Sequence, residues 1–94
     1  MKFNSWSMKR IREGKKTLTS RSKRYENDPH VTNILGPLPL WFICIYLYRD
    51  EGADDPQELK RIINQIWRRN VSWNQELYVH VLNVEKILEG DTKE

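Results

Sequence analysis

Residues 14–21, GKKTLTSR, gather the side chains of this sequence that are best suited to hold a charged or polar ligand. Two amines and a guanidinium in this segment can pair with phosphate oxygens, and three hydroxyl groups can bond to a base edge or a sugar. The cations are Lys15, Lys16 and Arg21, and the hydroxyl groups belong to Thr17, Thr19 and Ser20. This chemistry is typical of recognition of a nucleotide.

Positive charge is concentrated in the first quarter of the chain. Residues 1–24 contain nine Lys or Arg and one acidic residue, whereas residues 25–94 contain seven Lys or Arg and twelve acidic residues. A basic segment attracts phosphate backbones because binding releases their counterions. The same segment also suits a solvated charged face, or an interaction module that docks an acidic protein partner.

Capping residues and side-chain alternation predict the elements that carry this segment. Ser5 or Ser7 can cap a short basic helix, and Gly14 lies where such a helix would end. Residues 16–21 then alternate around Leu18 between β-branched threonines, which predicts a strand. The basic side chains are therefore expected at the junction between a helix and a strand.

A predicted loop and a predicted strand lie between this strand and the next helix. Residues 22–39 are polar and contain three prolines, which predicts a long loop. Residues 40–48, LWFICIYLY, are apolar throughout and predict a fully buried strand. Near the end of the chain, residues 76–87 alternate as a strand, and a tail over residues 89–94 is expected to fray.

The clearest element is a helix that begins after Asp55. Asp55 suits the N-cap, Pro56 suits the first helical position, and Glu58 completes a capping box. One face of this helix carries Leu59, Ile62, Ile63, Ile66 and Trp67. We expect the helix to end at Asn70. The order helix, strand, loop, strand, helix, strand predicts one α+β domain over residues 1–88.

The stretch IREGKKTLTSR resembles the signature of the ASCH domain, a family of the PUA-like superfamily, in which a short helix ends in Gly-x-Lys-Thr-x-Thr-x-Arg. The matching residues are Gly14, Lys16, Thr17, Thr19 and Arg21. The resemblance implies a small PUA-like mixed β-barrel with two flanking helices. The family's Gly-Asp-led strand is replaced here by YENDPHVTNILGPLPL, so we expect a reduced or open barrel.

The resemblance also implies a basic cleft that binds RNA or a nucleotide-like ligand. The residues expected to bind it are Lys15, Lys16, Thr17, Thr19, Arg21, Lys23, Arg24 and Trp6. The rings of Trp6, Tyr25 and Trp41 can stack on an unpaired base, although each of these side chains also suits packing in the core.

Some bacterial members of this family hydrolyse the acetyl amide of acetylated cytidine with a lysine, a threonine and a glutamate. The corresponding residues here are Lys16, Thr19 and Glu51, with Asp50 and Asp54 as alternatives to Glu51. In this amidohydrolase interpretation, the threonine attacks the amide carbonyl after a lysine amine, kept neutral by burial, accepts its proton.

Lys16 and Thr19 can act in one site only if the backbone brings both side chains to the same pocket. Residues an odd number of positions apart face opposite sides of a regular strand. The chain must therefore turn between Gly14 and Lys16 if both side chains are to reach one pocket. The alternative is structural: the threonines are good strand residues, Lys16 is a solvated charge and Glu51 is an ordinary turn residue.

The remaining reactive residues narrow the class of protein. Cys44 is the only cysteine, which excludes an intramolecular disulfide and a cysteine zinc cluster. His30 and His80 have no neighbour at metal-ligand spacing, so we expect neither a metal nor a cofactor. No apolar run approaches the roughly 20 residues that span a bilayer. We therefore expect a cytoplasmic protein that does not associate with membranes.

Overall fold

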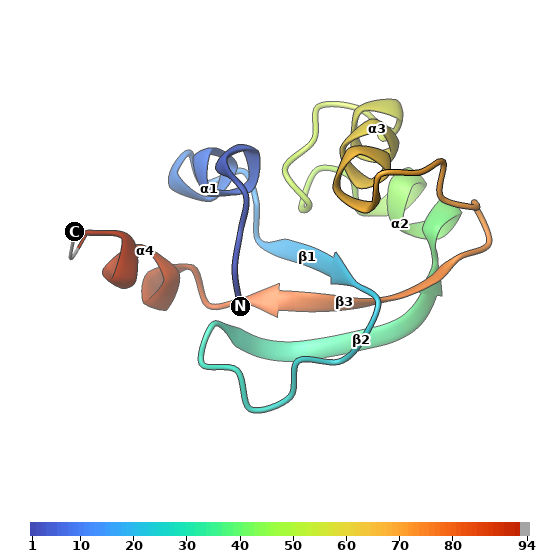
Figure 1. Cartoon of the computed structure of the whole chain (residues 1–94). Helices are drawn as coiled ribbons and strands as arrows, with labels where there is room; N and C mark the ends of the chain where they lie inside the picture. Colours follow the sequence, from blue (N-terminus) through green and yellow to red (C-terminus); the bar gives the residue numbers. More distant parts are fainter. Residues whose placement is uncertain (93–94) are drawn as a thin grey trace.

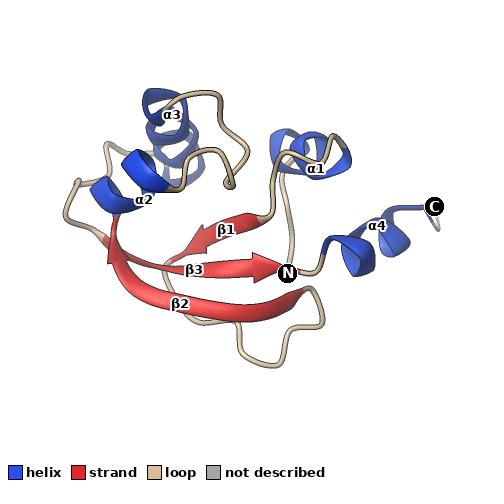
Figure 2. Ribbon diagram, turned by 180° about the vertical axis from the view of Figure 1, so that it is seen from behind, coloured by secondary structure: helices blue, strands red, loops and turns tan. Residues whose placement is uncertain are grey.

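The computed structural model describes residues 1–92, in which three antiparallel strands form an open sheet beside four helices. The elements are α1 (Ser5–Arg12), β1 (Leu18–Arg21), β2 (Val31–Pro39), α2 (Leu40–Tyr46), α3 (Pro56–Trp67), β3 (Glu76–Leu82) and α4 (Val84–Thr92). In Figures 1 and 2, α1, α2 and α3 gather on the side of the sheet where β1 lies. The predicted α+β class is confirmed. Residues 1–92 form four helices, whereas we expected two.

The sheet has the order β1-β3-β2, so the signature strand β1 lies at one edge. Thr19 pairs with His80 and Ser20 pairs with Val79. Because successive side chains of a strand point to opposite faces, Thr19 and Ser20 belong to different faces of the sheet. The Val79 face packs against α2 and α3 in one buried cluster that includes Leu18 and Ile63.

Helix α1 begins at Ser5, earlier than either predicted cap would allow. The Asn4 side chain is the N-cap, and its Oδ1 accepts the N–H of Ser7 at 2.8 Å. The prediction of Ser5 or Ser7 was wrong because Ser5 is already helical and Ser7 is buried in the first turn. The predicted end is confirmed: Gly14 has a φ of 74° and donates its N–H to the Ile11 carbonyl at 3.0 Å.

The start of α3 confirms Asp55 as the N-cap and Pro56 as the first helical residue. The Glu58 side chain accepts the N–H of Asp54 and not that of Asp55, so the predicted capping box is displaced by one residue. Asp55 Oδ1 accepts the N–H of Glu58 at 2.8 Å, and Pro56 is the first helical residue. The helix ends at Trp67, earlier than the predicted Asn70, because Arg68 adopts a left-handed conformation with a φ of 55°.

The prediction of a buried strand over residues 40–48 was wrong, because this segment forms α2. Leu40, Ile43 and Cys44 recur at helical spacing and are buried, whereas Trp41, Ile45 and Tyr46 are exposed. A short apolar run fits a strand and a helix equally well, so its hydrophobicity does not distinguish the two.

Contacts with a distant segment favour the helix at residues 40–46. The N–H of Leu40 donates to the Gln75 carbonyl at 2.8 Å, and the N–H of Trp41 donates to the Trp73 carbonyl at 2.9 Å. The first N–H groups of a helix have no partner inside the helix. The segment before β3 supplies these partners, which no local sequence pattern could reveal.

The predicted loop over residues 22–39 was wrong in its second half, which forms β2. Its prolines are tolerated because β2 is an edge strand, where a missing N–H need not break a ladder. The pairing with β3 shifts between Leu35 and Leu38, where Gly36 and Pro37 lie. Gly36 and Pro37, which predicted a loop, therefore lie at a shift in register within β2.

The predicted strand over residues 76–87 is confirmed only as far as Leu82. Helix α4 follows, and Asn83 Oδ1 accepts the N–H of Lys86 at 3.2 Å as an N-cap would. Of the tail expected to fray, residues 89–92 belong to α4, and residues 93–94 lie outside the described residues. Within residues 1–92, no helix combines the length and apolarity needed to cross a membrane.

His80 is fully buried in the middle of β3. Its Nε2 accepts the N–H of Tyr25 at 3.0 Å, and its Nδ1 lies 3.0 Å from the Tyr78 carbonyl, to which it donates in the neutral ring. Burial lowers the pKa of His80 below 6.5, against the opposing effect of nearby carbonyls. The neutral imidazole thus ties the loop after β1 to the sheet.

We predict that the free energy of unfolding falls as the pH drops below 6.5 and keeps falling until the lowered pKa of His80 is reached. The reason is that the unfolded chain binds this proton more tightly than the folded chain does. Urea unfolding above and below pH 6.5 checks this prediction. His80→Gln should show a smaller fall over this range, and an equal fall in both proteins would contradict it.

Candidate functional site

Lys16 and Glu51 form a buried pair between the start of β1 and the loop after α2. Their side chains are each 3% exposed. Lys16 Nζ donates to the Glu51 carbonyl at 2.9 Å and to Glu51 Oε1 at 3.3 Å. Burying two charged groups carries a desolvation cost that is tolerable only when they are hydrogen-bonded. A pair of this kind is unusual in a small domain and is a candidate site.

Backbone contacts between the start of β1 and the loop after α2 bring the two residues together. Lys16 and Glu51 form an antiparallel bridge, and the N–H groups of Thr17 and Leu18 both donate to the Asp50 carbonyl. Gly52 has a φ of 97°, and a Cβ at this position would lie 3.0 Å from the Lys16 Cβ. Glycine therefore allows the loop to turn while it stays against the lysine.

The chain turns at Gly14, and β1 begins only at Leu18. The turn does not bring Lys16 and Thr19 to one pocket, because Lys16 does not line the cavity that Thr19 lines. The structure brings Lys16 to Glu51. Asp50 and Asp54 are both exposed, and neither lies within hydrogen-bonding distance of the Lys16 amine. Among the three acids considered, Glu51 is therefore the one that meets the lysine.

Burial lowers the pKa of Lys16 below its ordinary value of 10.5. The charge and hydrogen bond of Glu51 act in the opposite direction, and the nearby Arg21 charge lowers the pKa further. The two residues lie at ion-pair distance, yet the cost of burying an ammonium dominates. The amine is thus easier to deprotonate than that of an exposed lysine.

A hydroxyl group completes the buried pair. Ser20 Oγ donates to Glu51 Oε2, while Lys16 bonds to Oε1 of the same carboxylate. The sequence placed Ser20 among the hydroxyl groups able to contact a base edge or a sugar, but Ser20 was not among the residues expected to bind the ligand or to act in catalysis. The signal was present, because Ser20 lies an even number of residues from Lys16 and so shares its face in an alternating strand.

Beside this cluster lies a cavity of about 140 Å³ between the N-terminal segment, β1 and α3. We call it the edge cavity. Its polar wall consists of Lys2, Asn4, Ser7, Thr19, Ser20 and Arg21. Its apolar wall consists of Ile63, Ile66 and Trp67. Ser20 belongs both to this cavity and to the hydrogen-bonded cluster beneath it.

Thr19 is buried and lines the edge cavity, but it does not join the cluster. Among the described residues, its hydroxyl makes no hydrogen bond to Lys16 or Glu51. Arg21 lines the same cavity and is held by a 2.6 Å hydrogen bond to the Lys2 carbonyl. Its guanidinium also lies over the rings of Phe3 and Tyr25.

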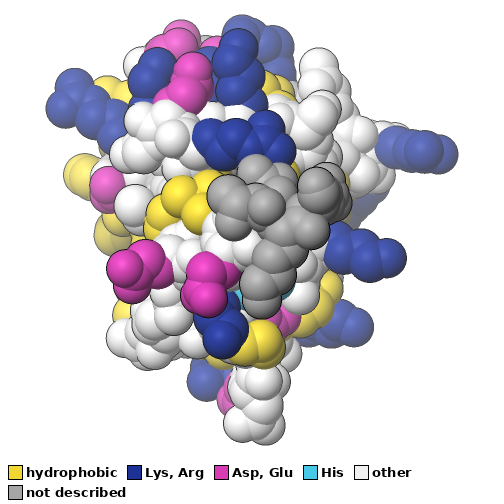
Figure 3. All heavy atoms as spheres, turned by 90° about the vertical axis from the view of Figure 1, so that its left-hand side faces the viewer, with side chains coloured by type: hydrophobic (Ala, Val, Ile, Leu, Met, Phe, Trp, Pro, Cys, Tyr) yellow, Lys and Arg dark blue, Asp and Glu magenta, His cyan; other side chains and the backbone are white. Residues whose placement is uncertain are grey.

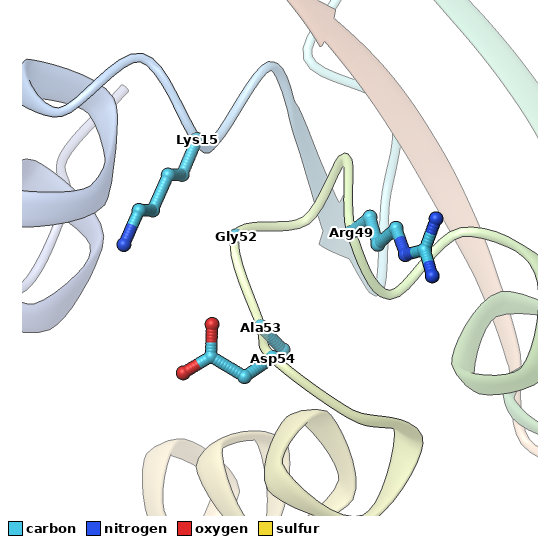
Figure 4. A pocket seen from close by; sticks show the side chains of 5 residues that line it. All are labelled: Lys15, Arg49, Gly52, Ala53 and Asp54. Carbon is cyan, nitrogen blue, oxygen red and sulfur yellow. The ribbon is translucent and has the colours of Figure 1, made fainter.

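The other residues expected to bind ligand lie elsewhere. Lys15 lines a separate hollow with Asp54, and Figure 4 shows both side chains on the same side of the Gly52 loop. Trp6 is half-buried and packs on the core, with the Lys16 amine 5.8 Å from its ring centre. Thr17, Lys23 and Arg24 are exposed and do not line the edge cavity.

The basic residues do not form one continuous patch on the side that carries α1 and α4. In Figure 3, Lys and Arg side chains project from separate places, with Asp and Glu side chains between them. Ion pairs join Arg10 to two of the acidic residues, Asp54 at 3.6 Å and Glu58 at 3.9 Å. Within residues 1–92, no three His, Cys, Asp or Glu side chains are grouped to hold a metal.

Comparison of the chain with protein-family models, curated proteins and solved structures finds no match. The geometry of the site is therefore the basis for its interpretation.

We predict strong energetic coupling between Lys16 and Glu51. Lys16→Met leaves the carboxylate buried without its amine, so it should lower the free energy of unfolding by about 3 kcal/mol. The double variant Lys16→Met/Glu51→Gln should lose less than the sum of the two single variants. Urea unfolding of all four proteins measures the coupling, and additive losses would contradict it.

Proposed function

We propose that the chain binds a nucleotide-like ligand, either free or as an unpaired nucleotide of an RNA, in the edge cavity. The observation that carries this proposal is the composition of the cavity walls, in which cations, hydroxyl groups and an indole surround one small space. A nucleotide needs all three kinds of contact, for its phosphate, its polar edges and its base.

The polar wall supplies the contacts for phosphate and base edges. Arg21 is the best placed cation, because its bond to the Lys2 carbonyl and its position over Phe3 fix the guanidinium before a ligand arrives. A cation that is already ordered loses less entropy on binding. Asn4, Ser7 and Thr19 add hydrogen-bonding groups on the same wall.

The apolar wall and the volume of the cavity limit the ligand. Trp67 and Ile63 offer apolar surface against which a base can pack. A space of about 140 Å³ accepts a single base or part of one. A paired base is confined within its helix, so single-stranded or free nucleotides suit this cavity better than duplex RNA.

The resemblance to the ASCH signature agrees with this location. Thr19 and Arg21 of the signature line the edge cavity, and Lys16 lies in the cluster beneath it. We therefore propose that the open sheet is a reduced PUA-like barrel that keeps the ligand cleft of that superfamily.

We predict that Arg21→Gln weakens binding of a short labelled single-stranded RNA by about tenfold, because one charge-assisted contact to phosphate is lost. Fluorescence polarisation measures the affinity, which should also fall steeply with salt. Arg61→Gln is the control, since Arg61 is exposed on α3 away from the cavity.

Equal losses in the two variants would contradict a ligand site in the edge cavity. Absence of RNA binding together with binding to an acidic protein would favour the docking module instead.

A second function, amide hydrolysis of an acetylated cytidine nucleoside, is favoured by one specific observation. The buried cluster joins an amine, a carboxylate and a hydroxyl that borders the cavity. Hydrolytic sites that use a hydroxyl nucleophile need a neighbouring group to accept its proton. Here Glu51 contacts the hydroxyl directly, and a neutral Lys16 leaves this carboxylate without a balancing positive charge.

We predict that acetate release from acetylated cytidine rises with pH through the lowered pKa of Lys16 and levels off below 10.5. The reason is that only the neutral amine leaves the carboxylate free to attract a proton. Lys16→Met has no amine to titrate, so it should lose this rise with pH, and Lys9→Met, at an exposed position of α1, is the matched control that should keep it. Release that is independent of pH in the unaltered chain, or a rise with pH that survives in Lys16→Met, would contradict this function.

A further inference from the structure

Within residues 16–21, the structure distinguishes between two neighbouring hydroxyl groups. We infer that Ser20, rather than Thr19, is the nucleophile that accepts the acyl group in the hydrolytic function. This inference rests on the amidohydrolase function proposed above and names the residue that forms the covalent intermediate. Its basis is the position of the Ser20 hydroxyl between the buried carboxylate and the edge cavity.

The contacts of Glu51 distinguish Ser20 from the other hydroxyl groups that line the cavity. One carboxylate oxygen accepts from Ser20 and the other lies 3.3 Å from the Lys16 amine. Among the described residues, the hydroxyl groups of Ser7 and Thr19 make no hydrogen bond to this carboxylate. Only Ser20 therefore combines access to a ligand with a proton acceptor already in place.

The register of the sheet explains why adjacent residues differ. Ser20 pairs with Val79, on the face that packs against α3, whereas Thr19 pairs with the buried His80 on the other face. The apolar wall of the edge cavity comes from α3. Ser20 therefore belongs to the sheet face that this wall covers, where water is partly excluded.

The proposed reaction balances without any further reagent. Ser20 Oγ attacks the amide carbonyl and its proton passes to Glu51, forming a bond between serine oxygen and the acyl carbon. The bond between this carbon and nitrogen then breaks, and Glu51 returns the proton to the departing amine. Water next attacks the ester, gives its proton to Glu51 and releases the acid, after which the proton returns to Ser20.

An activated acetyl ester provides the test. We expect the full chain, incubated with p-nitrophenyl acetate and quenched, to carry one acetyl group that tandem mass spectrometry places on Ser20. Ser20→Ala should abolish both this adduct and acetate release from acetylated cytidine, and Ser20→Thr should restore part of each. Ser22→Ala is the matched control, because Ser22 is exposed and lies outside the cavity and the cluster.

The possible failures are distinguishable from one another. An adduct on Thr19, or acetate release that persists in Ser20→Ala, would overturn the role of Ser20 while leaving the hydrolytic function standing. Absence of both adduct and release in the unaltered chain would overturn the hydrolytic function and this inference together. Circular dichroism of Ser20→Ala separates loss of the nucleophile from loss of the fold.

Discussion

The buried contact between Lys16 and Glu51 is the interaction on which the arrangement of this molecule depends. It joins the edge strand β1 to the loop that connects α2 and α3, two segments that are 35 residues apart in the sequence. The same place holds the backbone bonds from Thr17 and Leu18 to the Asp50 carbonyl. Because α3 follows directly after this loop, the contact also sets where the apolar wall of the edge cavity stands.

The cost of this contact shapes its chemistry. A lysine and a glutamate that are almost completely removed from water must satisfy each other, and Ser20 supplies a further hydrogen bond. The lowered pKa of Lys16 follows from the same burial. A purely structural link between two segments could be built from apolar residues at lower cost, so the presence of an ionisable cluster beside a cavity supports a chemical role.

The edge position of β1 explains why an open cavity lies beside a buried cluster. A strand in the middle of a sheet has neighbours on both sides, whereas β1 pairs with β3 alone over residues 18–21. The free side of β1 is closed at its start by the Glu51 loop and left open further along, where the edge cavity lies. His80 and Tyr25 hold the opposite face of the strand through the loop that follows it.

The sequence alone determined the elements whose stability is local. The end of α1 at Gly14 and the capped start of α3 each depend on residues within a few positions of one another. The strand β1 was predicted from its side-chain alternation, although its partner is the distant strand β3. A contact between Lys16 and an acid of the turn at residues 50–54 was also predicted, through the resemblance to a signature, and the structure places Lys16 against Glu51.

Tertiary structure decided the elements and contacts that depend on distant residues. The apolar run at 40–46 became a helix because carbonyls at Trp73 and Gln75 accept its first N–H groups. The proline-containing segment at 31–39 forms a strand because it pairs with β3. The pairing with β3 likewise decided that Ser20, and not Thr19, contacts Glu51, since side-chain alternation says which residues share a face but not what covers that face.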